Sequence, residues 1–483
     1  MATQDLEQMI RDGRLARLGA LSTDDIKRAA EVIKQVHAEQ VETVRVLFAD
    51  PHGTLRGKTV TAHALADAFT SGVHAPSTLL LKDVTQKTVF PVWSPGSDSP
   101  LHGVGDILMA PDPQTFRILP WSPHSALLLT NLYSTDGKPL AISSRGVLQN
   151  ACAQLRAREH DALFGLEVEF QVFEVVDAVL NHPDTTMPGR PPVTRATHQG
   201  YQYLSETRYG EVEPLLDRLR RAAQGMGMPV RSVEIEMGPS QFEFTFDAAY
   251  AMTIADMAIM FRALAKEVCH REGLLASFMA KPRLANAFAN GWHIHQSITD
   301  LDGRNLFVPD DHTPTPQASA WIAGLLRNAA ASCIATTPTV NGYKRYGRYK
   351  LAPNRIGWAQ DNRGAMLRTL FTPGESASRI ENRVAESGVN PYLALAFQLI
   401  SGMDGLDQNL EAPEPLADPY GDDAELLPSN LLGAVETFAA SDLFREALGP
   451  EFVTYLARLK RAEWDDYVGT VSEWEHAAYF ANL

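Results

Sequence analysis

Four short stretches of the chain alternate acidic or histidine side chains with apolar ones: residues 166–170 (LEVEF), 234–246, 292–295 (WHIH) and 379–383 (RIENR). Successive side chains of a β-strand point to opposite faces of the sheet. This spacing therefore predicts strands that pack apolar side chains into a core and present ligand-type side chains on one shared face. That face would carry Glu167, Glu169, Glu236, Glu243, His293, His295 and Glu381.

The rest of the chain shows mainly helical spacing after a short β-rich region. Ser22 and the acids behind it predict the start of a helix over residues 26–36. Alternation at 44–48 and 55–60 predicts a hairpin, and the proline and glycine between 77 and 121 favour loops over a surface. Further helices are expected at residues 144–159, 210–225, 251–272 and 319–331, and as several elements after Asn390-Pro391.

Strands and helices that alternate along a chain often form a parallel doubly wound sheet. Strands of a parallel sheet, however, are buried on both faces and read as continuous apolar runs, whereas these strands are polar on one face. We therefore predict an α+β fold in which an antiparallel sheet lines a cavity and helices lie outside it. The expected organisation is a helical segment over residues 1–40, a small β-rich domain over 41–137 and a large domain over 138–483.

A strand face crowded with carboxylates requires positive charge, because gathered carboxylates repel one another and lose their hydration. Hard divalent ions, bound by oxygen ligands with an occasional imidazole, are the usual partners of such a face. Glu167 and Glu169 alone would be read more simply as a solvated strand face, and a lone histidine is more often structural than a ligand. The recurrence of the pattern at Glu236, Glu243 and His293 favours a metal site.

Basic residues are concentrated between Lys344 and Arg383, in a chain whose formal net charge is −15. The first part of this region, rich in glycine, proline and asparagine, is equally compatible with a solvated loop. Arg379 and Arg383 flank Glu381 on one predicted strand face, where guanidinium groups bind carboxylates and phosphates in a bidentate manner. Metal ions and arginines around one cavity indicate phosphoryl transfer, in which positioning and charge neutralisation supply most of the catalysis.

Net charge and cysteine usage exclude several classes of function. A charge of −15 argues against a nucleic-acid partner or an anionic membrane surface, because both are bound through Lys and Arg. The 3 cysteines lie far apart, which indicates neither a disulfide framework nor a thiolate zinc site and favours a reducing compartment. Residues 1–19 are too polar for a secretion signal, and no stretch approaches the roughly 18 apolar residues of a membrane span. A cytoplasmic enzyme is expected.

Six motifs, in this order, resemble those of the glutamine synthetase superfamily. They are GLEVEF from Gly165, EMGPSQFE from Glu236, Lys281-Pro followed by His293-Ile-His295, NGYKR up to Arg345, Asp361-Asn-Arg363 up to Arg368, and RIENR from Arg379 leading into Asn390-Pro-Tyr. The resemblance covers nearly the whole chain. It implies a small amino-terminal β-grasp domain, a curved catalytic sheet, and a homo-oligomer of two stacked hexamers in which a neighbour's β-grasp domain completes each active site.

The resemblance also implies roles for individual positions, with ATP, L-glutamate and two or more Mg²⁺ or Mn²⁺ ions as ligands. The first metal would be held by Glu169, Glu236 and Glu243, and the second by Glu167, His293 and Glu381. ATP phosphates would be held by His295, Arg368 and Arg379. Glutamate and the transferred phosphoryl group would be held by Arg345, Arg363 and Arg383. The expected catalytic residues are Arg345, Arg363 and Glu243.

The chain departs from the family pattern where glutamine synthetases bind ammonium. The position of an acid on their mobile loop, which helps to deprotonate ammonium, is Leu351 here, and the segment around Pro76 and Ser77 lacks their ammonium-binding aspartate. Tyr203 retains the match to a third ammonium-site residue. The segment 288–292 (FANGW) is also longer and bulkier than usual, which bears on how the glutamate backbone is seated.

An apolar amine pocket at Leu351, Tyr203, Pro76 and Ser77 leads to the main hypothesis: an ATP-dependent ligase that joins glutamate to an organic primary amine through γ-glutamyl phosphate. Burial of an apolar amine there would recover about 25 cal/mol per Å². Alkyl amines and weakly basic aromatic amines such as aniline fit this pocket. The alternatives are a polyamine ligase of the putrescine type, then an ordinary glutamine synthetase. A non-catalytic structural relative is disfavoured because all six metal-ligand positions are kept.

Overall fold

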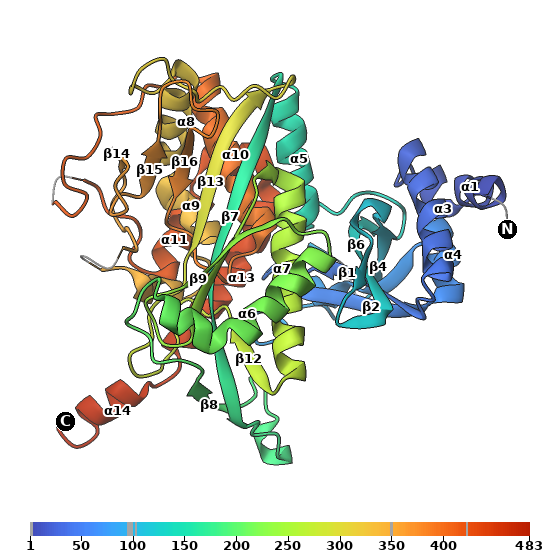
Figure 1. Ribbon diagram of the computed structural model, residues 1–483, viewed down its shortest axis with the longest axis horizontal. Coiled ribbons are helices and arrows are strands. Elements are labelled where there is room, and N and C mark those ends of the chain that lie inside the picture. Colours follow the sequence, from blue (N-terminus) through green and yellow to red (C-terminus); the bar gives the residue numbers. More distant parts are fainter. Residues whose placement is uncertain (1–2, 94–99, 102–103, 348–350, 422–423) are drawn as a thin grey trace.

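The structure is a computed structural model that describes residues 3–93, 100–101, 104–347, 351–421 and 424–483. A small amino-terminal domain lies beside a much larger one (Figure 1). Helices of the small domain are α1 (Thr3–Arg11), α2 (Arg14–Arg17), α3 (Thr23–Ala38) and α4 (Leu65–Ser71). Its strands are β1 (Thr43–Ala49), β2 (Leu55–Thr61), β3 (Val73–Pro76), β4 (Asp106–Pro111), β5 (Arg117–Leu119) and β6 (Ser122–Ser134).

The small sheet separates two hydrophobic cores. Its strand order is β2-β1-β6-β4-β3, with β1 and β2 forming the expected hairpin and β1 pairing in parallel with β6. Because side chains alternate along β6, Leu128 packs with the helices α1–α4, whereas Leu127 and Leu129 face the core of the large domain. Residues 1–40 therefore share a core with the strands that follow them. Helix α3 begins as predicted, since Ser22 and Asp25 form a reciprocal capping box.

One prediction for this domain is wrong in part. The region from 77 to 121 contains the strand β4 and a one-turn helix at Ser77–Leu80, rather than loops alone. β4 lies between β6 and β3, and five of its six residues are buried, so it does not show the apolar–polar alternation of a half-exposed strand. The chain then passes from β6 to the large domain between Ser134 and Ser144.

The large domain consists of an extended, mainly antiparallel sheet backed by helices, which confirms the α+β prediction. Its strands are β7 (His160–Asp177), β8 (Val193–Ala196), β9 (Val230–Ile235), β10 (Gln241–Phe246), β11 (Ala249–Tyr250), β12 (Leu274–Ser277), β13 (Trp292–Asp300), β14 (Trp358–Gln360), β15 (Leu367–Leu370) and β16 (Arg379–Asn382). The central order is β14-β15-β16-β13-β7-β10-β9, with β14 and β15 parallel.

Helices cover one face of this sheet and leave the other face for the site. The helices of the large domain are α5 (Ser144–Arg156), α6 (Glu206–Gly225), α7 (Ala251–Arg271), α8 (Pro316–Arg327), α9 (Ala329–Thr336), α10 (Pro391–Asp407), α11 (Leu431–Ala439), α12 (Asp442–Leu448) and α13 (Pro450–Val468), followed by α14 (Glu473–Tyr479), which does not pack on the sheet. On β7, Phe170 packs against Phe261 of α7 with ring centroids 5.7 Å apart. Glu167 and Glu169 alternate with these apolar residues and so point to the opposite face.

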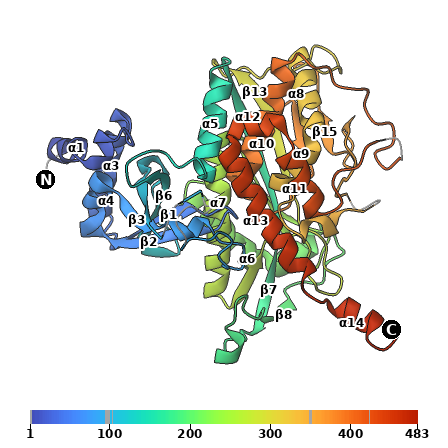
Figure 2. The ribbon, with the colours of Figure 1, turned by 180° about the vertical axis from the view of Figure 1, so that it is seen from behind.

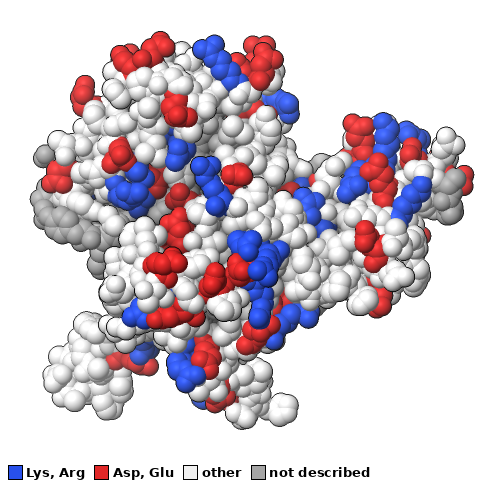
Figure 3. All heavy atoms as spheres, viewed as in Figure 1, with Lys and Arg blue, Asp and Glu red and all other residues white. Residues whose placement is uncertain are grey.

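The carboxyl-terminal helix α14 extends away from the body of the molecule (Figures 1 and 2). It buries none of its residues, and Trp474 and Phe480 near it are largely exposed. Among the described residues, no helix is both long enough and apolar enough to cross a lipid bilayer. On the face shown in Figure 3, acidic and basic side chains are interspersed over both domains.

Candidate active site

Strand register brings the predicted ligand residues together. Glu243 of β10 lies opposite Glu169 of β7, and His293 of β13 lies opposite Glu167. On the other side of β13, His295 pairs with Glu381 of β16. Cross-strand partners on one face lie about 5 Å apart at Cβ, so these pairings alone place the acids and imidazoles in contact range.

Three groups of these side chains lie close enough to hold a metal ion, with all ligand atoms of a group within 4.8 Å of one another. They are Glu169, Glu236 and Glu243; Glu167, Glu243 and His293; and Glu167, His295 and Glu381. The first group is the expected first metal set. The members of the expected second set are divided between the other two groups, although His293 Nδ1 is 3.3 Å from Glu167 and 3.8 Å from Glu381. His295 is an additional neighbour of that set.

The electrostatics of the cluster favour a bound cation. Burial, followed by the charge of Glu169, raises the pKa of Glu236 to about 8 and that of Glu243 to about 10. Burial also opposes ionisation of Glu167, but hydrogen bonds from His293 and His295 outweigh it and lower the pKa of this carboxyl. Carboxylate oxygens with one or two imidazoles are the donor set of a hard divalent ion, so these residues fit Mg²⁺ or Mn²⁺.

A cavity of about 560 Å³ opens onto this cluster, and we call it the carboxylate cavity. Its polar lining includes the acids of the first two groups and His293, together with Arg345, Arg363, Arg368 and Arg383. Arg345 and Arg383 are buried, and in the part of the chain that the structure describes their Nε atoms have no hydrogen-bond partner. Arg345 Nη1 donates to the carbonyl of Val384 and Arg383 Nη1 to Glu381, so each guanidinium group is held in place while one of its nitrogens lacks a partner. Guanidinium groups beside a cation site are suited to binding the oxygens of a carboxylate or phosphoryl group.

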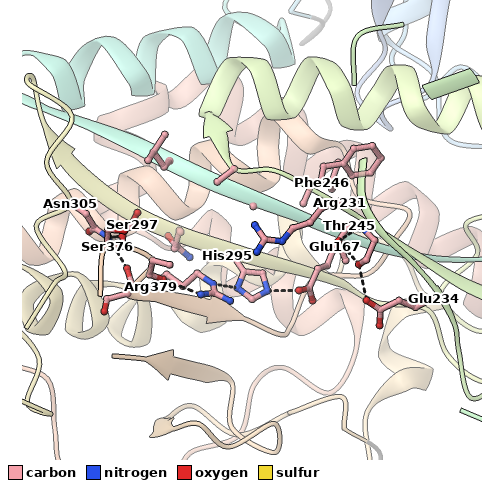
Figure 4. A pocket seen from close by; sticks show the side chains of 18 residues that line it. Glu167, Arg231, Glu234, Thr245, Phe246, His295, Ser297, Asn305, Ser376 and Arg379 are labelled. Carbon is pink, nitrogen blue, oxygen red and sulfur yellow. Dashed lines mark hydrogen bonds and ion pairs between the residues drawn. The ribbon is translucent and has the colours of Figure 1, made fainter. Parts of the chain in front are cut away.

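A second cavity of about 400 Å³ adjoins the first, and we call it the His295 cavity (Figure 4). Glu167 and Glu234 line both cavities. In the His295 cavity, Arg379 Nε donates to His295 Nδ1 over 3.0 Å, and His295 Nε2 lies 3.0 Å from Glu167. The chain Arg379–His295–Glu167 therefore links this cavity to the metal cluster, and the phosphate-binding role of Arg379 and His295 stays a prediction.

The structure separates some residues that the sequence grouped together. Arg368 lines the carboxylate cavity rather than the His295 cavity, and its Nη1 donates to Glu381 over 3.1 Å. Leu351 and Tyr203 both line the carboxylate cavity, and their assignment to an amine pocket stays a prediction. Pro76 and Ser77 lie instead at the β3 edge of the small sheet and do not line this cavity. Within one chain they are therefore not part of the site.

Sequence reasoning missed several residues of the two cavities. Glu234 pairs with Glu243 across β9 and β10 and lines both cavities. The sequence did offer a clue to it, because Glu234 is an acid in the same alternating stretch as Glu236 and Glu243. Arg231 and Phe246 line the His295 cavity at the ends of β9 and β10. These two residues line the cavity because β9 and β10 place them there, and no sequence motif marks either of them as a site residue.

Comparison with known proteins agrees with this geometry. The glutamine synthetase N-terminal domain model matches residues 28–140, and the glutamine synthetase catalytic domain model matches residues 141–479. A γ-glutamylanilide synthase of Acinetobacter sp is 35% identical over 95% of this chain and 97% of its own length. A glutamine synthetase of Methanosarcina mazei is 30% identical over 94% of this chain and 98% of its own.

A solved structure of a GmaS–ADP complex superposes with a TM-score of 0.78 at 28% identity, covering 93% of this chain and 99% of that one. The family models together account for nearly the whole chain. On this basis the protein belongs to the glutamine synthetase family and is an ATP-dependent ligase that forms carbon–nitrogen bonds with glutamate.

Proposed function

We propose that this ligase joins L-glutamate to an organic primary amine, giving a γ-glutamylamide, ADP and phosphate. The observation that carries the proposal is the position of Leu351, which lines the carboxylate cavity at the place where resemblance predicts an acid for handling ammonium. An apolar side chain there does not stabilise a small hydrated cation, but it favours burial of an alkyl or aryl group.

The two adjoining cavities suggest how the substrates are arranged. ATP would occupy the His295 cavity and glutamate the carboxylate cavity, so that the γ-phosphate and the γ-carboxylate meet beside Glu167. Arg345 and Arg383 would hold oxygens of glutamate and of the transferred group through their unsatisfied guanidinium nitrogens. Bound divalent ions would neutralise the phosphates and polarise the reacting oxygens.

The reaction proposed has two displacement steps. A γ-carboxylate oxygen attacks the γ-phosphorus of ATP, and the bond from that phosphorus to the bridging oxygen of ADP breaks. The amine nitrogen then attacks the γ-carbonyl carbon, loses one proton, and displaces inorganic phosphate. Arg363, exposed on the cavity wall, is placed to neutralise the phosphoryl group in both steps. A neutral arylamine has its lone pair free at pH 7 and requires no carboxylate to uncover it.

The polyamine alternative fits this cavity less well. A putrescine-type amine carries a second ammonium group, which would require an acid at the far side of the amine pocket. The apolar and aromatic part of the cavity lining is formed by Tyr203, Leu204, Met237, Phe288, Leu351 and Ala352. Burying a charged group against apolar side chains costs several kcal/mol unless it is paired. We therefore place polyamines behind alkyl and aryl amines.

We further propose that the protein works as a ring-shaped homo-oligomer. Pro76 is exposed on the edge strand β3 of the small sheet, where a neighbouring subunit's carboxylate cavity could receive it. Large apolar side chains around α14 are also exposed in the single chain. Exposed apolar groups of this size commonly mark contacts between subunits. Two stacked hexamers are the arrangement that the resemblance implies.

A coupled phosphate-release assay tests the proposed function. Purified protein is given saturating ATP, Mg²⁺ and L-glutamate with one nucleophile at a time: aniline, isopropylamine, ethanolamine, putrescine or ammonium. Mass spectrometry of each reaction identifies the γ-glutamyl product. We expect kcat/KM for at least one organic monoamine to exceed that for ammonium and putrescine. Preference for ammonium over every amine would identify an ordinary glutamine synthetase instead.

A further inference from the structure

Large apolar side chains line part of the carboxylate cavity, and we call them the apolar rim. Five of the cavity's lining residues are large apolar side chains that remain more than a third exposed: Tyr203, Leu204, Met237, Phe288 and Leu351. Solvent-exposed apolar groups are unremarkable when scattered, but a contiguous set beside a catalytic cluster marks a binding surface. The lining of this cavity therefore combines acids and arginines with large apolar side chains.

The backbone holds parts of this rim in conformations that large side chains rarely adopt. Leu204 has φ 54° and Leu351 has φ 53°, both in the left-handed region that ordinarily favours Gly or Asn. Tyr201, next to the rim, has φ 58°. Strained residues of this kind persist where the surrounding structure requires their side-chain positions, and they gather at ligand-binding sites. The rim is therefore held in place at a cost in conformational energy.

Phe288 is the most firmly positioned member of the rim. Its carbonyl oxygen accepts a hydrogen bond from Gln171 of β7 over 3.1 Å, and the next carbonyl, of Ala289, accepts one from Gln241 of β10 over 2.8 Å. The amide of Gly291 in the same segment donates to Glu169 over 2.8 Å. The loop that carries Phe288 is thus tied to the strands that carry the metal-ligand positions.

Close packing also fixes the Phe288 ring. Tyr201 meets it edge-on, with centroids 5.6 Å apart and an interplanar angle of 77°, and the Tyr201 hydroxyl donates to the carbonyl of Asn286 over 3.0 Å. A Cβ at Gly238 would lie 2.9 Å from the Phe288 Cβ and 2.6 Å from Gln241 Oε1, so only glycine fits there. One face of the ring packs against the protein while the side chain remains 40% exposed to the cavity.

We propose that the apolar rim binds the organic substituent of the amine, an inference that rests on the proposed function. Within the rim, Phe288 is the specificity-determining residue, and its ring selects a flat apolar group such as an aryl ring. A flat ring gains an offset or edge-to-face contact with Phe288, whereas ammonium has no apolar group to place against that ring. A dicationic polyamine would place its second charge against Met237 and Leu351. The substrate class inferred is a neutral arylamine.

The test compares Phe288→Ala and Phe288→Leu with the wild type, using Leu284→Ala as a matched control. Leu284 is an exposed apolar residue of the same loop region that does not line the cavity. For each protein, kcat/KM is measured for aniline, isopropylamine and ammonium at saturating ATP and glutamate, and KM is measured for glutamate. We expect Phe288→Ala to lower kcat/KM for aniline at least about tenfold, while the value for ammonium and the KM for glutamate change less than about twofold.

Phe288→Leu separates shape from hydrophobicity, since it keeps an apolar side chain but loses the flat ring. This variant should retain the wild-type kcat/KM for isopropylamine and lose most of the preference for aniline over isopropylamine. Two results would overturn the inference: an equal fall for all three nucleophiles, or a rise in the KM for glutamate with the ratio of aniline to ammonium unchanged. Failure of the proposed function would be distinguishable from failure of this inference, because the wild type itself would then use ammonium and none of the organic amines.

Discussion

Glu243 faces Glu169 directly across the β7–β10 strand pair, and both carboxyl groups belong to one group of ligand atoms within 4.8 Å. Burial and the Glu169 charge raise the pKa of Glu243 to about 10, so this side chain is protonated at neutral pH when no metal is bound. Metal binding must displace that proton, because a carboxylate binds a cation and a carboxylic acid does not.

Replacement of Glu243 by Gln should therefore abolish amide formation without weakening the metal-free fold. Gln resembles the protonated acid, so Tm in EDTA should match the wild type, while the rise in Tm on adding Mg²⁺ or Mn²⁺ should be lost. Differential scanning fluorimetry with and without metal measures both quantities. Glu174→Gln, on the same strand β7 but outside the cluster, is the control that should behave like the wild type. Wild-type turnover by the Glu243 variant, or full activity in a chelator, would contradict the metal assignment.

A pH effect is expected at Glu386, which is buried and close enough to Arg345 to interact with its charge. Burial raises its pKa from 4.5 to about 7, and hydrogen bonds from Thr339 of 2.9 and 3.1 Å only partly offset the shift. A carboxyl whose pKa is raised on folding stabilises the protein fully below the unfolded pKa, and this contribution is lost as the pH rises through the folded value. The shift corresponds to about 3 kcal/mol.

Glu386→Gln should remove this dependence, because the amide cannot ionise. The Tm of the variant should match that of the wild type below about pH 4.5, exceed it increasingly up to about pH 7, and differ from it by a constant amount at higher pH. Thermal unfolding in matched buffers checks this, with Glu446→Gln on the surface of α12 as control. Parallel Tm profiles for wild type and Glu386→Gln would show that the buried carboxyl does not change its charge in this range.

The metal cluster was predictable from sequence because it obeys a strict local rule. Glu167, Glu169 and His293 lie within strands, where a period of two residues decides the face, and neighbouring strands then bring equivalent faces together. Arg363, in contrast, lies in a turn outside any strand, and only the resemblance placed it. β4 was missed for the opposite reason: it is buried on both faces, so burial removed the alternation on which strand prediction depends.

The residues of the apolar rim could be predicted from the sequence only in part. Leu351 and the bulky Phe288 departed from the family pattern and therefore attracted notice, but their packing partners come from other segments. Tyr201 and Met237 reach the rim through the backbone bond from Tyr201 N to the carbonyl of Met237, which is 2.7 Å long. Tertiary contacts of this kind leave no periodic trace in the sequence. Residues contributed by a second subunit, as proposed for Pro76, are harder still to predict from sequence, because they come from another chain.

The shared-site proposal predicts complementation between two inactive variants. Arg363→Ala damages the carboxylate cavity, whereas Pro76→Arg places a bulky cation at the exposed β3 edge of the small domain. If each site combines one subunit's cavity with a neighbour's β3 edge, both homo-oligomers should be inactive. Random co-assembly in equal amounts should restore about a quarter of the sites.

Activity assays on the co-expressed, doubly tagged protein measure this recovery, and light scattering gives the mass of the active species. A particle several times the mass of the chain is expected. An active monomer, or full activity of Pro76→Arg by itself, would contradict the shared site.

The final prediction concerns the charge of the amine pocket. Leu351 is more than half exposed to the cavity at a φ of 53°, so Leu351→Glu and Leu351→Gln carry the same backbone cost and nearly the same volume. Any difference between the two variants therefore reports the charge alone. A carboxylate at this position would attract ammonium and could accept its proton, while it would weaken binding of an apolar amine by about 1–3 kcal/mol.

Measurement of kcat/KM for ammonium and aniline, at saturating ATP and glutamate, gives the ratio of the two nucleophiles in each protein. We expect the wild type to favour the organic amine, Leu351→Gln to lose part of that preference through reduced apolar contact, and Leu351→Glu to shift the ratio furthest towards ammonium. The shift should grow as the pH rises through the pKa of the introduced carboxyl group, because only its ionised form attracts ammonium and accepts its proton. Identical ratios in the Glu and Gln variants would show that position 351 selects amines by size rather than by charge.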